Sequence, residues 1–140
     1  DRTHLVAAAY LHDVGHSPAL RTTGFHPLDG ARYVRAAGHE RLAGLVAHHS
    51  EARFQAELLG YSEALAEFPR EVSETADALA YCDLTTGPSG GVVTFEERIE
   101  ELFNRYAPES IVLEALRRAM PDLAKAVGRT ERRLARIGVG

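Results

Sequence analysis

The stretch AYLHDVGHS, residues 9–17, carries the feature from which the fold and function of this chain are interpreted. An apolar run with helical character ends there in the adjacent pair His12 and Asp13, and Gly15 follows two residues later. A neutral imidazole nitrogen beside a carboxylate oxygen can bind a divalent metal, and the second carboxylate oxygen is free to bridge to another cation. A His-Asp pair is common by chance, so its meaning depends on the other candidate ligands that the chain offers.

Further metal ligands are available in three separate segments, each at the end of an expected helix or in a loop. They are His26, the pair His48 and His49, and Asp83. Helix ends that point into one cavity are how all-α proteins assemble a metal site from distant segments. Each of these residues taken alone is equally consistent with a helix cap or a solvated side chain. Asp77 competes with Asp83 for the last position, which we assign to Asp83, whereas His4 and His39 are assigned to the surface.

The hydrophobic periodicity is helical along nearly the whole chain, with no strand-like alternation. The fold class expected is therefore all-α, a compact bundle of about six to eight helices. Thr94 and Glu97 have the spacing of a capping box, and Ser110 is a candidate N-cap. The expected helices cover residues 3–13, 27–37, 39–50, 56–68 with an interruption at Gly60, 71–84, 94–107, 110–120 and, restarting at Pro121, 121–137.

The segment from Gly87 to Gly91 is the clearest loop in the chain. Its glycines make it flexible, and it follows Asp83 closely. It is either a lid over the candidate site or an ordinary connection between two helices.

Composition limits the class of protein. A chain of 140 residues fits one domain, residues 1–140, and 45% hydrophobic residues suffice for a globular core. The net charge of −4 argues against a nucleic-acid partner, and no apolar run or signal-peptide pattern predicts a membrane or secretory role. The single Cys82 excludes an internal disulfide and fits a reducing compartment, so we expect a cytoplasmic protein. The oligomeric state is left open.

The chain resembles the HD superfamily of metal-dependent phosphohydrolases over about residues 5–107. The resemblance implies that His12, Asp13 and Asp83 bind a first metal. It further implies that Asp13 bridges to a second metal, held by His26 and His48, with His49 as a further candidate. Which of the two adjacent histidines is the true ligand is left open. The motifs that carry the resemblance are LHDVG at 11–15, HPLDGA at 26–31, VAHHS at 46–50 and YCDLT at 81–85.

Three positions depart from the family pattern. The first metal histidine of the family normally lies on a helix well upstream of His-Asp, and His4 is a poor substitute because it shares the helix of His12. Either that ligand and its helix lie upstream of Asp1, which is the expectation we favour, or the first metal site is incomplete. The family's cyclic di-GMP phosphodiesterases carry a Gly-Tyr-Pro motif that is missing after His49, so that substrate is not predicted. His16 replaces a lysine that is frequent after His-Asp in relatives.

The activity that the resemblance implies is hydrolysis of a phosphate ester or a nucleotide with divalent metal ions such as Mn, Fe, Mg, Co or Ni. We expect Asp13 to be essential for metal binding and for activity. His16 is a candidate contact to a phosphate oxygen. Arg21, Thr85 and Thr86 are further candidate phosphate contacts. Each has an ordinary alternative, because Arg21 can be a solvated loop residue and the two threonines can close a helix. A nucleotide phosphatase and a symmetrical dinucleoside-polyphosphate hydrolase are among the possible relatives.

Two rival functions remain open from the sequence. HD-type oxygenases use a mixed-valent diiron centre on the same scaffold, and a set of nitrogen and oxygen ligands accepts iron as well as manganese or magnesium. A non-catalytic signalling or ligand-binding domain is the second alternative, favoured if the upstream histidine does not exist.

Overall fold

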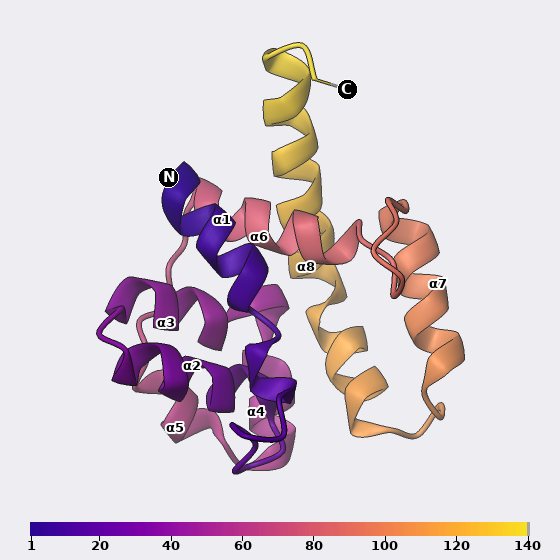
Figure 1. The fold of residues 1–140 in the computed structure, drawn as a ribbon. Helices are drawn as coiled ribbons and strands as arrows, with labels where there is room; N and C mark the ends of the chain where they lie inside the picture. Colours follow the sequence, from indigo (N-terminus) through magenta and orange to yellow (C-terminus); the bar gives the residue numbers. More distant parts are fainter. Residues whose placement is uncertain (140) are drawn as a thin grey trace.

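The computed structural model describes residues 1–139, and within them all regular structure is helical, as the periodicity predicts. Figure 1 labels the helices α1 to α8. The short 3₁₀ segment η1 lies between α1 and α2, and η2 lies between α3 and α4. The elements are α1 (Arg2–Leu11), η1 (Val14–His16), α2 (His26–Ala36), α3 (Glu40–Ala47), η2 (His49–Glu51), α4 (Arg53–Leu59), α5 (Ser62–Ala66), α6 (Glu74–Leu84), α7 (Phe95–Arg105) and α8 (Ile111–Arg136).

Helices α1 to α5 surround the larger hydrophobic core, and α6 contributes to it from one side (Figure 1). Phe25, Leu28, Val46 and Leu65 are among its fully buried side chains. Burial of these side chains removes apolar surface from water, which favours the packing of the helices around them. This core supports the ends of α1, α3 and α6, where the candidate metal ligands lie.

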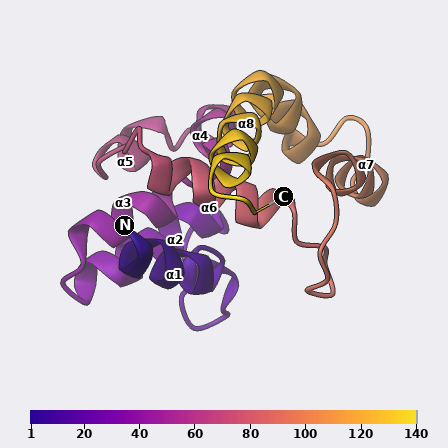
Figure 2. The same ribbon diagram turned by 90° about the horizontal axis from the view of Figure 1, so that it is seen from above.

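A second, smaller core joins α6 to α7 and α8. It contains Leu84, Phe95, Leu123 and Val127, all buried. Figures 1 and 2 both show α7 on the far side of α8, away from α1 to α5. Helix α6 therefore has one face in each core. In the described part of the chain, no helix combines the length and the apolar character that crossing a bilayer requires.

The expected break at Pro121 is wrong. Pro121 lies inside the 26-residue helix α8, which continues on both sides of it. A proline in a helix removes one backbone hydrogen bond and crowds the preceding turn. Buried residues flank it closely, Ala119 before it and Leu123 after it, and both belong to the second core. Burial of this continuous apolar face outweighs the local cost of the proline.

Two other helix ends differ from the expectation. Helix α3 ends at Ala47 rather than at residue 50, because the chain turns into η2, where Ser50 has a positive φ of 50°. The segment 56–68 is two short helices, and Gly60 ends the first with a left-handed φ of 82°. The capping box at Thr94 and the N-cap at Ser110 are both present.

Candidate metal centre

Four elements bring the candidate ligands together. His12 caps the C-terminus of α1, and Asp13 follows it. His26 is the first residue of α2, His49 opens η2, and Asp83 lies in the last turn of α6. The ends of helices from distant parts of the sequence thus meet in one place, as expected for a metal site in an all-α protein.

The close approach of η1 to α2 depends on Gly15. A Cβ atom at this position would lie 2.1 Å from the carbonyl oxygen of His26 and 2.7 Å from the backbone nitrogen of Gly30. Both neighbours are backbone atoms, which cannot move aside as a flexible side chain can. Only glycine lets the segment after His12 and Asp13 lie directly against the helix that carries His26.

Asp13 is the centre of the cluster. Its Oδ2 lies 3.2 Å from Nε2 of His12, and its Oδ1 lies 3.2 Å from Nε2 of His26 and 3.8 Å from Nε2 of His49. Nε2 of His12 is also 3.4 Å from Oδ1 of Asp83. The ligand atoms therefore form two groups that share Asp13, one with His12 and Asp83 and the other with His26 and His49, each within 4.8 Å. This is the arrangement of a carboxylate that bridges two cations.

Backbone carbonyls fix the tautomers of two histidines. Nδ1 of His12 lies 2.9 Å from the carbonyl oxygen of Ala9, and Nδ1 of His49 lies 2.6 Å from that of Val46. A carbonyl oxygen only accepts hydrogen bonds, so each Nδ1 carries a hydrogen. In the neutral ring the lone pair is then on Nε2, which faces the carboxylates. This outer-shell contact is typical of metal-binding histidines.

The pKa values of His12 and Asp13 are both shifted by the attraction between the imidazole and the carboxylates around it. Burial alone would lower the pKa of His12, but its hydrogen bonds to the carboxylates of Asp13 and Asp83 outweigh burial and raise the pKa to about 10. Burial opposes ionisation of Asp13 as well, yet contacts with His12 and His26 hold its pKa well below the usual range. The anionic groups attract a cation, and the donor set of imidazole nitrogens and carboxylate oxygens fits a divalent metal.

His48 lies outside the cluster, contrary to the expectation that it holds the second metal. Its Nε2 lies 2.9 Å from the carbonyl oxygen of Phe68, and its Nδ1 is buried without a hydrogen-bond partner among residues 1–139. His49 instead is buried and faces Asp13 and His26. His48 is the C-cap of α3 and His49 opens η2, and the chain directs the first ring to Phe68 and the second to the centre.

The other competitors are engaged elsewhere. Asp77 binds Arg129 and Arg133 through ion pairs of 2.8 and 2.9 Å, so Asp83 is the carboxylate of α6 that joins the cluster. His4 contacts Asp1 at the N-terminal end of α1. The assignment of this histidine to the surface agrees with its position.

The candidate phosphate contacts occupy different surroundings. His16 is exposed and stacks on His26, with ring centroids 3.8 Å apart. Arg21 is exposed in the loop before α2. The hydroxyls of Thr85 and Thr86 donate to the carbonyls of Tyr81 and Cys82, each at 2.7 Å, and thereby close the last turn of α6. His16 is thus the one of these four that directly contacts a residue of the cluster.

Sequence reasoning missed two supporting residues. Asp29 is 3% exposed and accepts hydrogen bonds from the backbone and hydroxyls of Thr22 and Thr23, which holds the loop in front of His26. The hydroxyl of Ser50 donates to Oδ2 of Asp83 at 2.6 Å. The Thr-Thr-Gly sequence shortly before Asp29 is a turn signal that points to the first. No local pattern identifies the second.

Comparison with known families shows to which family the chain belongs. Residues 1–86, which include all five residues of the cluster, match the HD domain. The chain belongs to the HD domain family. The match ends two residues after Leu84, the last residue of α6, so α7 and α8 lie outside the matched part of this HD protein. Comparison with curated proteins and with solved structures finds no significant match.

Proposed function

We propose that this HD protein is a metal-dependent phosphohydrolase that hydrolyses a phosphate ester or a nucleotide. In this proposal His12, Asp13 and Asp83 hold one divalent cation, and Asp13, His26 and His49 hold a second. The observation that carries the proposal is the position of Asp13, whose two oxygens face different histidines at 3.2 Å. Such a carboxylate can serve two cations at once, which is the arrangement used to hydrolyse phosphoesters with paired metals.

Divalent cations at such a site would polarise the phosphoryl oxygens and lower the pKa of a water molecule toward neutrality. The protein's own residues set up that chemistry. The Ala9 and Val46 carbonyls accept the Nδ1 hydrogens of His12 and His49, so Nε2 is the nitrogen that each ring would offer to a cation in place of a proton. Asp13, with 56% of its side chain exposed, is accessible to an incoming phosphate from solvent.

The chain needs no covalent nucleophile for this reaction. Cys82 is the only cysteine, and burial raises the pKa of its thiol. It therefore stays protonated and weakly nucleophilic at neutral pH. His16, exposed beside His26, is the proposed contact to a phosphate oxygen. Burial and the nearby His26 lower its pKa, so it contributes an N–H hydrogen bond more than a full positive charge.

The test begins with metal analysis of the purified protein. We then expect hydrolysis of phosphomonoesters, phosphodiesters and nucleotides with added Mn²⁺ or Co²⁺, at the same rate with and without oxygen. The Asp13→Asn variant should lose both the bound metal and the activity. Turnover that requires oxygen and tightly bound iron would instead support an HD-type oxygenase. Metal binding without any turnover would favour a non-catalytic ligand-binding domain.

A further inference from the structure

Ser50 makes a single long-range contact to the centre. Its hydroxyl donates a hydrogen bond to Oδ2 of Asp83 at 2.6 Å, across 33 residues of sequence. The other oxygen of Asp83, Oδ1, faces Nε2 of His12 at 3.4 Å. Within residues 1–139 no other side chain or backbone group donates a hydrogen bond to Oδ2. The serine therefore determines which oxygen of this carboxylate is turned toward His12.

The backbone at this position has an unusual conformation. Ser50 has φ 50° and ψ 41°, and the next residue, Glu51, has φ 57°. Residues other than glycine rarely adopt this left-handed region because the Cβ atom crowds the following carbonyl. The kink has a geometric consequence. Neighbours on a regular helix point about 100° apart, yet His49 and Ser50 both reach the cluster.

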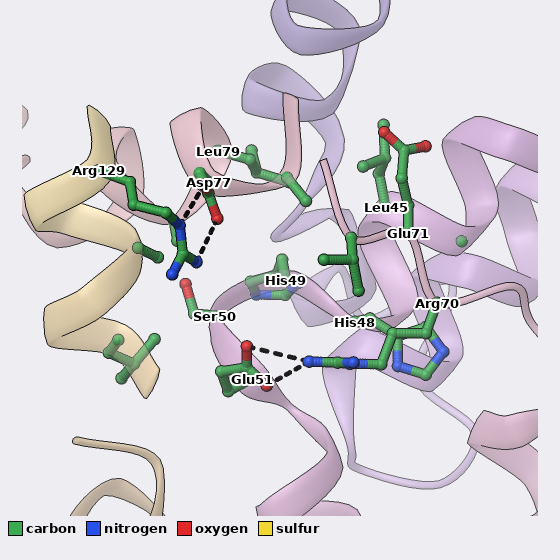
Figure 3. Close-up of a pocket in the computed structure, with 16 residues that line it drawn as sticks. Leu45, His48, His49, Ser50, Glu51, Arg70, Glu71, Asp77, Leu79 and Arg129 are labelled. Carbon is green, nitrogen blue, oxygen red and sulfur yellow. Dashed lines mark hydrogen bonds and ion pairs between the residues drawn. The ribbon is translucent and has the colours of Figure 1, made fainter. Parts of the chain in front are cut away.

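Ion pairs of Glu51, the residue after Ser50, hold the kink in place. Ser50 and Glu51 line a cavity of about 70 Å³, shown in Figure 3. The carboxylate of Glu51 pairs with Arg70 at 3.3 Å and with Arg53 at 2.9 Å. Strained backbone persists in a native structure only where neighbouring contacts over-determine it, and such positions are concentrated at functional sites.

We infer that Ser50 is a positioning residue, whose hydroxyl holds Oδ2 of Asp83 so that Oδ1 is presented to the cation shared with His12. The inference rests on the proposed metal site. Glycine would relieve the left-handed strain but would supply no hydroxyl to Asp83. A serine at this position therefore costs local stability, and its hydroxyl orients Asp83. Outer-shell partners of metal ligands orient those ligands in the same way.

Two substitutions separate the hydroxyl from the backbone. Ser50→Ala and Ser50→Gly both remove the donor to Asp83, but only glycine relieves the strain at φ 50°. We expect both variants to bind Mn²⁺ about ten- to a hundredfold more weakly than the wild type in calorimetric titrations. In urea unfolding of the metal-free proteins, Ser50→Gly should unfold at a higher urea concentration than Ser50→Ala. Ser50→Ala and Ser50→Gly would then lose the same metal affinity but differ in stability, which would show that the lost hydroxyl, and not the backbone strain, weakens metal binding.

Ser62→Ala is the control. It also removes a serine hydroxyl, but from an exposed position in α5 away from the cluster, so its affinity for Mn²⁺ should stay close to that of the wild type. If Ser50→Gly binds Mn²⁺ as tightly as the wild type, the positioning role is wrong. If the wild type itself binds no Mn²⁺, the proposed metal site is wrong and the inference falls with it.

Discussion

Nε2 of His26 and Nε2 of His49 face each other at 3.3 Å. Burial lowers the pKa of His49 to about 4, and its Nδ1 hydrogen is directed to the carbonyl of Val46. At neutral pH this ring therefore presents a lone pair, not a hydrogen, to His26. In the proposed site, a cation between these two nitrogens would be held by both of them and by Oδ1 of Asp13.

Removal of bound metal should therefore destabilise the protein. A ligand that binds only the folded state at a concentration 100 times its Kd adds about 2.7 kcal/mol to the free energy of unfolding. For a chain of this size we expect saturating Mn²⁺ to raise Tm by about 10 °C over the chelator-treated protein. Differential scanning fluorimetry with and without chelator measures the shift. Identical melting curves under the two conditions would contradict a metal at this centre.

The adjacent histidines provide a second prediction. His49→Gln should remove a ligand of the second cation and lower phosphoesterase activity by more than about a hundredfold, beyond the loss typical of groups that only orient a ligand. His48→Gln is its matched control, because the glutamine amide can still donate to the carbonyl of Phe68. Metal content per chain should fall in the first variant and stay near that of the wild type in the second. The reverse pattern would place His48 in the centre.

The ion pairs of Asp77 predict a pH-dependent contribution to stability. Burial alone would raise the pKa of this carboxyl, but hydrogen bonds from Arg129 and Arg133 outweigh it and lower the pKa. Asp77→Asn should therefore lower the free energy of unfolding at pH 7 by about 1–3 kcal/mol. Because the folded-state pKa lies below the unfolded-state value of about 3.9, this contribution is fully present at neutral pH. It is lost as the pH falls through the folded-state pKa.

Urea unfolding of the wild type and Asp77→Asn between pH 7 and pH 3 tests this prediction. The difference between the two proteins should be constant down to about pH 5 and should shrink at lower pH. A difference that grows with acidity would mean that Asp77 is stabilised in its protonated form.

Gly15 offers a test of the fold itself. Gly15→Ala would place a Cβ 2.1 Å from the carbonyl oxygen of His26, which forces η1 and α2 apart. We expect a loss of about 4–5 kcal/mol in the free energy of unfolding, at the upper end of single-residue effects. Gly91→Ala is the control, since a Cβ there meets no atom within 4 Å and its φ is not positive. Urea unfolding compares the two, and equal stability would show that η1 and α2 can separate at little cost.

Much of the fold was predictable because its signals are local. Helical periodicity, the capping box at Thr94 and the N-cap at Ser110 depend on residues a few positions apart, and all three are confirmed. Pro121 misled the prediction because its local cost is outweighed by apolar contacts of α8 with helices far away in the sequence. A local pattern contains no information on such contacts.

The sequence by itself determined the helical class, the family and the residue types that surround Asp13. Tertiary structure decided that His49 rather than His48 faces Asp13, and it places Asp83, already favoured from the sequence, in the cluster while Asp77 pairs with arginines. The left-handed kink at Ser50 and the packing of α6 between two cores set the direction of those side chains. The direction of a side chain depends on contacts between segments that are distant in the sequence. Local sequence patterns therefore cannot predict it, and only the folded structure shows it.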